Sequence, residues 1–256
     1  MAKIDENATE LVQTVAVPGT MENVVELQGL ITSVLSTRRG AVVNLSCGFR
    51  GMKRDKNGKF NRNQLQVTFL NKDDIKEGDY YAKNFSHGDK VSVHAVAQTV
   101  YDHISKTSHT ELWGLAMTKT EDKQITGFDK NEIHITGRVY SLYKRANGWY
   151  AISVTTSVTK THVNQVQKSY TITRKYKSIL PVSLYLNERE QSHVDIEKML
   201  TKGTWVDIYG YIRNYTSKSG EKLCGIVGQD IKIIGDPQPQ QNEDPSEKVE
   251  SAGDPL

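Results

Sequence analysis

The chain has 256 residues, of which 25% are charged and 37% hydrophobic, and its formal net charge at pH 7 is +3. This length suits two ordinary domains, and no apolar run approaches the roughly 18 residues of a membrane-spanning helix. The first ten residues are polar and partly acidic, unlike a secretory signal. The only two cysteines, Cys47 and Cys224, exclude a disulfide framework and indicate a cytoplasmic protein.

Charge is distributed unevenly along the chain. Residues 236–256 contain six acids and one base, and residues 1–20 carry a net charge of −2. Residues 21–235 therefore carry +10. A basic body with an acidic tail is typical of a protein that binds a polyanion, although a solvated surface with a solubilising tail has the same composition.

The two ends differ from the rest in composition. Residues 236–256 are rich in proline and acids and offer almost nothing apolar to bury, which predicts a disordered acidic tail. Residues 1–20 are expected to form a flexible segment, although residues 11–17 could add an edge strand.

Short runs that alternate apolar and polar residues fill the region between the ends. The clearest are residues 24–29, 42–47, 65–69 and 91–95. This period of two predicts strands with one buried face. Helical patterns occur only at residues 73–84 and 187–200.

The chain also repeats itself. Gly29 matches Gly137, the segment Phe69-Leu-Asn71 matches Tyr185-Leu-Asn187, and the turn at His87 matches that at Lys202. Each copy has three strands, a helix, a glycine turn and two strands, which is the element order of an OB-fold. We therefore predict an all-β protein with two tandem OB-folds, at residues 21–120 and 132–235, joined by a linker at 121–131. Two unrelated antiparallel β domains are the alternative.

Three segments of the second copy resemble bacterial single-stranded DNA-binding proteins (SSBs): residues 132–139, 179–185, and 210–215 followed by 219–222. Two OB domains with an acidic tail resemble in particular the two-OB SSBs of the Deinococcus–Thermus type, and a phage or mobile-element variant fits as well. The resemblance implies a homodimer that coats single-stranded DNA in replication, recombination, repair or transfer. It also implies replication or recombination proteins as partners of the tail, although this tail ends in Asp254-Pro-Leu256 and lacks the family's Pro-Phe tip.

Binding of single strands without sequence preference needs aromatic rings that stack on bases and basic side chains that neutralise phosphates. Tyr150, Ile152 and Val154 alternate and are expected to point into the barrel, so Trp149 should point outward as a stacking residue, unless it packs at the rim. The resemblance assigns stacking to Tyr185, which could instead pack against the helix. It also assigns DNA contact to Arg213 and Tyr215.

Two basic loops carry further candidates. Residues 157–177 contain no acid and predict a protruding hairpin, with Tyr170 for stacking and five bases for phosphates: Lys160, Lys168, Arg174, Lys175 and Lys177. The matching loop of the first copy, residues 48–62, offers Phe49 and Phe60 for stacking, unless they cap the barrel end. Its phosphate candidates are Arg50, Lys53, Arg54, Lys59 and Arg62. Phe69 joins the stacking set because it matches Tyr185.

No catalytic motif is present. The sequence lacks a Walker loop, a His-Glu-x-x-His pair and a Gly-x-Ser-x-Gly turn, and its histidines are scattered singly. We therefore predict a binding protein that is not an enzyme and that has no catalytic residue, metal or cofactor. The alternative function is an OB-fold module that binds protein or RNA without coating single-stranded DNA. Trp113 and Trp205 remain open between burial and function, with a dimer contact as one possible role of Trp205.

Overall fold

A computed structural model describes residues 20–48, 56–58, 62–72, 75–103, 106–120, 130–145, 148–163, 171–184, 198–216, 220 and 222–235. Within these ranges, the side chains of residues 159–163, 171–176 and 222 are not described. The expected acidic tail, and most of the expected helix at 187–200, lie outside the described residues.

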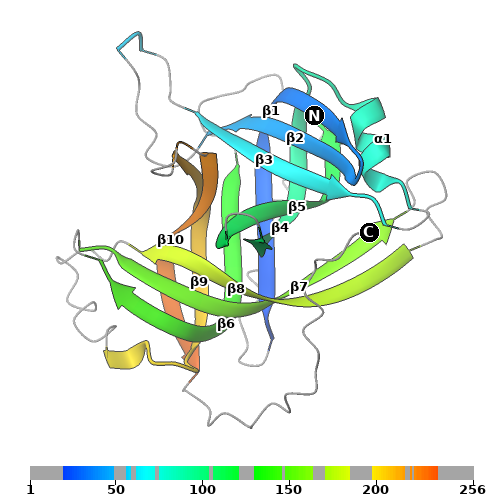
Figure 1. Cartoon of the computed structure of the whole chain (residues 1–256). Coiled ribbons are helices and arrows are strands. Elements are labelled where there is room, and N and C mark those ends of the chain that lie inside the picture. The colour runs from blue at the N-terminus through cyan, green and yellow to red at the C-terminus, as the bar shows by residue number, and fades with distance from the viewer. Residues whose placement is uncertain are drawn as a thin grey trace, which may run out of the picture.

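Within the described ranges, ten strands form two barrels of the same topology (Figure 1). The first contains β1 (Glu22–Thr37), β2 (Gly40–Cys47), β3 (Asn63–Leu70), α1 (Glu77–Asn84), β4 (Lys90–Asp102) and β5 (Thr107–Lys119). The second contains β6 (Asn131–Lys144), β7 (Tyr150–Val163), β8 (Thr171–Leu184), β9 (Trp205–Thr216) and β10 (Lys222–Gly235). In each barrel the first strand pairs with the second and fourth, and the third pairs in parallel with the fifth. These pairings close an OB-fold barrel, so the predicted fold class is confirmed.

The strands follow the alternation of the sequence. On β3, Leu65 and Val67 are fully buried whereas Gln64 and Gln66 are exposed. Gly29 and Gly137 lie where the first strand of each barrel turns from one neighbour to the other. A Cβ at Gly29 would lie 2.7 Å from the Ser46 carbonyl oxygen, and a Cβ at Gly137 would lie 2.2 Å from that of Thr155. Only glycine permits this close approach of the backbones.

Helix α1 closes one end of the first barrel. The ring of Tyr81, on this helix, packs on Phe69 with ring centroids 4.3 Å apart, and the Tyr81 hydroxyl accepts a hydrogen bond from the Met117 backbone amide. Burial, and then the charge of Glu77, raise the pKa of Tyr81 to about 12, so it stays neutral. In the part of the chain that the structure describes, no helix has the length and apolarity needed to cross a membrane.

An internal twofold relation joins the two barrels. Strand β1 pairs antiparallel with β6, and the residues at the centre of the pairing, Val25 and Ile133, are equivalent in the two copies. Asn23 uses its side-chain amide to bond both backbone groups of Ala97, and the equivalent Asn131 bonds both backbone groups of Ile212. One continuous hydrophobic core extends through both barrels.

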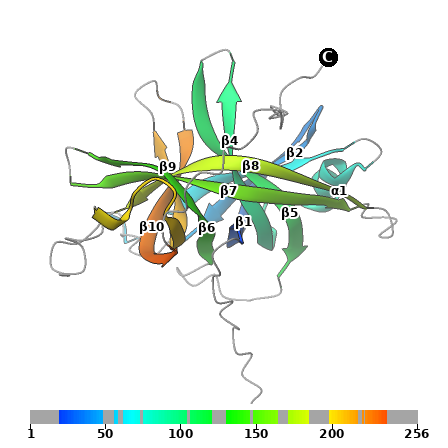
Figure 2. The ribbon, with the colours of Figure 1, turned by 90° about the horizontal axis from the view of Figure 1, so that it is seen from below.

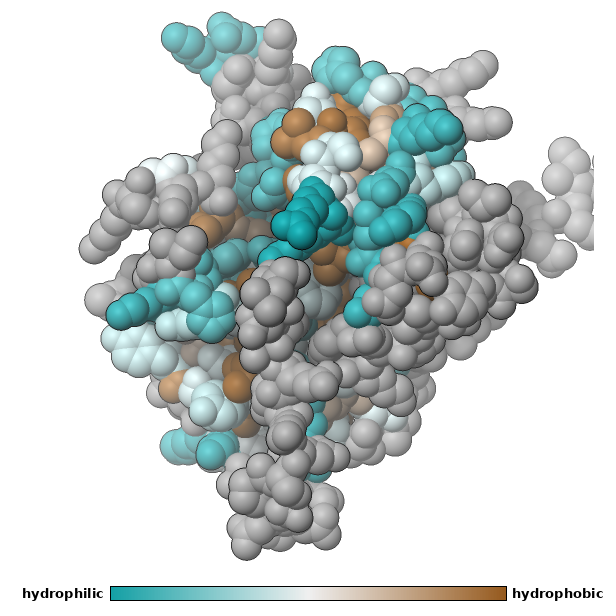
Figure 3. All heavy atoms as spheres, turned by 45° about the vertical axis from the view of Figure 1, so that its right-hand side comes forward, coloured by the Kyte–Doolittle hydropathy of each residue, from teal (hydrophilic) through white to brown (hydrophobic). Residues whose placement is uncertain are grey.

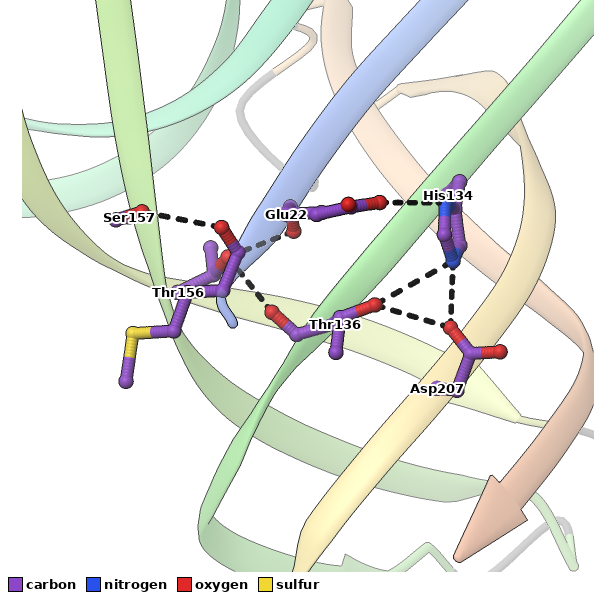
Figure 4. Close-up of polar contacts among 7 residues, drawn as sticks. Glu22, His134, Thr136, Thr156, Ser157 and Asp207 are labelled. Carbon is purple, nitrogen blue, oxygen red and sulfur yellow. Dashed lines mark hydrogen bonds and ion pairs between the residues drawn. The ribbon is translucent and has the colours of Figure 1, made fainter. Parts of the chain in front are cut away.

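Polar side chains complete the seam between β1 and β6 (Figure 4). The ring nitrogens of His134 face two carboxylates, Glu22 at 3.4 Å and Asp207 at 2.5 Å. Thr136 donates a hydrogen bond to the same Asp207 oxygen, and Thr156 donates to the Glu22 backbone carbonyl. The seam therefore combines strand pairing with buried polar contacts, which fixes one orientation of the barrels.

Candidate nucleic-acid interface

The outer face of β7 and β8 is built from small side chains. Tyr150, Ile152 and Val154 point into the barrel, as predicted. The residues between them and their neighbours on β8 face outward: Ala151, Ser153, Thr155, Ser157, Ile179, Pro181 and Ser183. In OB-folds this face, with the loops after the first and fourth strands, binds oligonucleotides. The described part of the face has no aromatic side chain, so any aromatic ring that borders it lies at its rim.

The rim is aromatic and basic where β6 turns into β7. We call this set the β6–β7 corner; it comprises Tyr140, Tyr143, Lys144, Arg145 and Trp149. Tyr143 is 67% exposed and Tyr140 is 51% exposed, whereas Trp149 is half-buried. The turn is tight, because the Arg145 amide donates to the Trp149 carbonyl at 2.7 Å. The corner therefore presents aromatic rings and two cations between the end of β6 and the start of β7.

Sequence reasoning included only Trp149 of this corner. Tyr140 and Tyr143 were not predicted because they lie beyond residues 132–139, which carry the family resemblance. The available signal was the order aromatic, base, base before a glycine turn, at Tyr143-Lys-Arg145 and Gly148. This is the same combination that singled out the two basic loops.

A second aromatic position lies at the β9–β10 end of the second barrel. Tyr215 is 51% exposed, and Arg213 is exposed two residues before it on the same face of β9. The ring of Tyr215 lies over Gly225, where a Cβ would come within 3.0 Å of it. The first barrel has Tyr101, 50% exposed, at the comparable place. Both barrels thus present a tyrosine at the end of the fourth strand.

The predicted basic hairpin is formed by β7 and β8, which pair from Tyr150–Leu184 to Val163–Thr171. Lys177 is exposed on it. The register places Lys160 opposite Arg174, with Lys175 next to that pair. Figure 2 shows the two strands running together toward the side of the molecule that carries α1. The hairpin therefore extends from the second barrel along the first.

The stem of this hairpin is docked rather than free. Val158 is fully buried and packs with Val96 and Trp113 of the first barrel in a small apolar cluster of its own. The hydroxyl of Thr99 donates to the Ile179 carbonyl at 2.7 Å. Trp113 is therefore a buried contact between the barrels, and Trp205 is buried as well, with 3% of its surface exposed.

Arg62, predicted to bind phosphate, is held against the neighbouring strand. Its Nε donates to the Ser46 hydroxyl at 3.0 Å, and a terminal nitrogen donates to the Ser46 carbonyl at 2.7 Å. The side chain is half-buried. These bonds fix the guanidinium at the base of the β2–β3 loop.

The prediction that Phe69 stacks on bases is wrong. Its side chain is fully buried, with its ring packed on Tyr81 and over Gly114, where a Cβ would come within 2.2 Å. The pairing of the third and fifth strands shows that Val67 corresponds to Val182, so Phe69 corresponds to Leu184 rather than Tyr185. A shift of one residue in a strand moves a side chain to the opposite face.

Other predicted contacts fall outside what the structure describes. The stacking candidates Phe49, Phe60, Tyr170 and Tyr185, and the bases Arg50, Lys53, Arg54, Lys59 and Lys168, lie outside the described residues. The backbones of Lys160, Arg174 and Lys175 are placed, but their side chains are not described.

Two observations concern the titratable groups of the described ranges. Burial raises the pKa of the Cys224 thiol to about 12, so it is not a nucleophile near neutral pH. Across the described ranges, no three His, Cys, Asp or Glu side chains gather in a way that could hold a metal ion. The arrangement around the β6–β7 corner is suited to binding by stacking and ion pairing.

Two solved structures share this architecture over nearly the whole chain. The wild-type SSB from Thermus aquaticus matches with a TM-score of 0.55 at 15% sequence identity, covering 86% of this chain and 97% of that one. A deletion variant of the same protein matches with a TM-score of 0.53 at 15% identity, covering 89% and 99%. No family model matches the sequence, and no curated protein sequence matches it significantly. The resemblance seen in the sequence is thus confirmed at the level of the fold, two OB barrels in tandem.

Proposed function

We propose that this protein binds and coats single-stranded DNA with little sequence preference. The observation that carries the proposal is the β6–β7 corner, where Tyr143, Trp149, Lys144 and Arg145 border the small-residue face of an OB barrel. Exposed aromatic rings cost solvation free energy, and stacking on unpaired bases offsets that cost. A double helix hides the faces of its bases, so this surface favours single strands.

A path for the strand follows from the arrangement of the barrels. Bases would stack at Tyr143 and Trp149, cross the face of β7 and β8, and reach Lys177 on the hairpin. Because the hairpin stem is docked on the first barrel, the strand can pass from one barrel to the other along it. The basic residues of 157–177 and 48–62 would then neutralise its phosphates.

The proposal includes the finer roles implied by the resemblance to the SSB family. The protein would act in replication, recombination, repair or transfer of DNA, as a homodimer. The shared fold with the Thermus aquaticus SSB supports these roles.

Titration with oligo-dT, followed by tryptophan fluorescence at two salt concentrations, tests the proposal. We expect quenching that weakens as salt rises, by about 0.7 logarithmic units of affinity per tenfold salt for each phosphate contact. A duplex of the same length should compete at least tenfold less well. Binding of duplex as tight as that of dT, or no binding of dT, would contradict the proposal and favour a protein or structured-RNA ligand.

A further inference from the structure

We propose that Arg138 and Lys202 form a phosphate-binding site on the second barrel, beside the β6–β7 corner and apart from the strand face. The proposal rests on the proposed function, because the ligand it commits to is a phosphodiester group of the bound single strand. We call this pair, together with Tyr140 and Trp205, the phosphate seat.

Arg138 is a half-buried cation without a counter-charge in the described structure. Its guanidinium lies over the ring of Trp205, with Cζ 4.9 Å from the ring centre. Its Nε is buried and has no hydrogen-bond partner among the described residues. A buried charge and an unpaired donor both cost free energy unless a partner compensates them. A guanidinium stacked by its face keeps the donors of its edge free for a phosphate.

Lys202 lies in a turn that is bonded to the residue after Arg138. The turn of residues 201–204 is bonded to β6 on both sides of Val139: Val139 donates to the Thr204 carbonyl at 2.9 Å, and Gly203 donates to the Val139 carbonyl at 2.8 Å. Lys202 is exposed, and its ammonium lies 5.6 Å from the ring centre of Tyr140. Arg138 therefore directly precedes Val139 on β6, and Lys202 directly precedes the glycine that is bonded to Val139.

The same place in the first barrel lacks these groups. By the equivalence of Gly29 with Gly137, and of the turns at His87 and Lys202, Arg138 corresponds to Leu30 and Tyr140 to Thr32. His87, the counterpart of Lys202, has its ring bonded to the Thr32 backbone carbonyl. A feature needed for the OB-fold itself would recur in both barrels, so the seat is a property of the second barrel's surface.

On the side of the molecule shown in Figure 3, the described residues interleave hydrophobic and hydrophilic side chains without one large apolar patch. Tyr140 belongs both to the corner and to the seat. A strand stacked at the corner can therefore continue over Tyr140 and place a phosphate between Arg138 and Lys202.

The test measures the affinity for oligo-dT as a function of salt for the wild type, Lys202→Ala and Arg138→Ala. Loss of one phosphate contact lowers the slope of log affinity against log salt by about 0.7 for single strands. We expect that decrease in each variant, with a fall in affinity of about threefold to tenfold at low salt. Lys83→Ala is the matched control, since it removes an exposed base from α1 and should leave slope and affinity unchanged.

The outcomes separate this proposal from the proposed function. If the wild type binds dT but both variants keep its slope, the seat is wrong and the proposed function stands. If the wild type does not bind dT, both the phosphate seat and the proposed function are contradicted. Lys202→Ala is expected to fold normally, because the turn is held by backbone bonds. A lower melting temperature of Arg138→Ala without a change of slope would mean that Arg138 serves only to pack on Trp205.

Discussion

The two barrels share one internal frame and carry different surfaces. Asn23 and Asn131 make the same paired amide bonds to the fourth strand of their barrels, and Gly29 and Gly137 allow the same close approach of backbones. At the corner after the first strand the correspondence ends. The place of Tyr143 is taken in the first barrel by Leu35, which is 54% exposed and is followed by Arg38 and Arg39.

This difference shows which residues the fold itself requires. Positions with no room for another atom, or with backbone groups to satisfy, are the same in both copies. Positions that face solvent have diverged, and the described aromatic rings that suit stacking are concentrated on the second barrel. Under the proposed function, the second barrel is therefore the expected main contributor to affinity for the strand, and the first barrel is expected to extend the strand's path.

The largest effect is expected at the two glycines. Gly137→Ala and Gly29→Ala should each destabilise the protein by about 3 kcal/mol, because the added Cβ overlaps a carbonyl oxygen. Urea unfolding measures both. Gly58→Ala is the control, since a Cβ there meets nothing within 4 Å and only its positive φ is strained. A loss of unfolding free energy in only one of the two variants would contradict the structural equivalence of these positions in the two barrels.

The two buried asparagines come next. Asn131→Ala and Asn23→Ala each leave buried backbone groups without partners, which should cost about 2–3 kcal/mol. Asn44→Ala, which loses a partly buried bond to Ser33, should cost less than about 1 kcal/mol. Thermal unfolding compares all three. Equal melting temperatures for Asn23→Ala and the wild type would show that the seam tolerates the loss on one side.

Val158 tests the apolar contact of the β7–β8 hairpin with the first barrel. Val158→Ala removes apolar contacts with Val96 and Trp113 and should lower the free energy of unfolding by about 1–2 kcal/mol. Because the hairpin would then dock less firmly, affinity for dT long enough to reach both barrels should fall more than affinity for short dT. An equal fall for both lengths would mean that docking does not guide the strand.

The smallest effect concerns the turn before the fourth strand. The hydrogen bond from Lys119 lowers the pKa of Asp89 below its usual 3.8, so the carboxylate stabilises the folded state above that pH. This contribution is lost as the pH falls through the lowered value. Asp89→Asn should therefore cost up to about 1 kcal/mol at pH 7 and nothing at a pH well below 3. A difference that persists in acid would assign the effect to the bond with Ser86 instead.

Much of the fold could be predicted from the sequence, because period-two alternation and the repeated glycines reflect local physical constraints. The helix at 73–84 was predicted, and the structure shows α1 at Glu77–Asn84. The basic hairpin was predicted as well. The docking of this hairpin on the first barrel was not predicted. The sequence around Val158 resembles that of other strand valines, and its contact depends on how the two barrels pack.

The site was harder to predict. Phe69 was assigned to the wrong face because matching Leu-Asn at an offset of 116 shifted the alignment of the two copies by one residue. The pairing of the third strand with the fifth in each barrel gives the correct alignment. Arg138 and Lys202 are far apart in the chain, and the backbone bonds of Val139 bring their segments together. Sequence patterns report local spacing, whereas this part of the surface depends on which strands become neighbours.

The most direct measurement compares dT binding by matched variants of the two corners. Tyr143→Ala in the second barrel should weaken binding by about 1–3 kcal/mol, the value of one lost stacking contact, with unchanged dependence on salt. Leu35→Ala at the equivalent place in the first barrel should bind like the wild type. Equal affinities for the two variants and the wild type would contradict the account, since the exposed ring would then have no part in holding the strand.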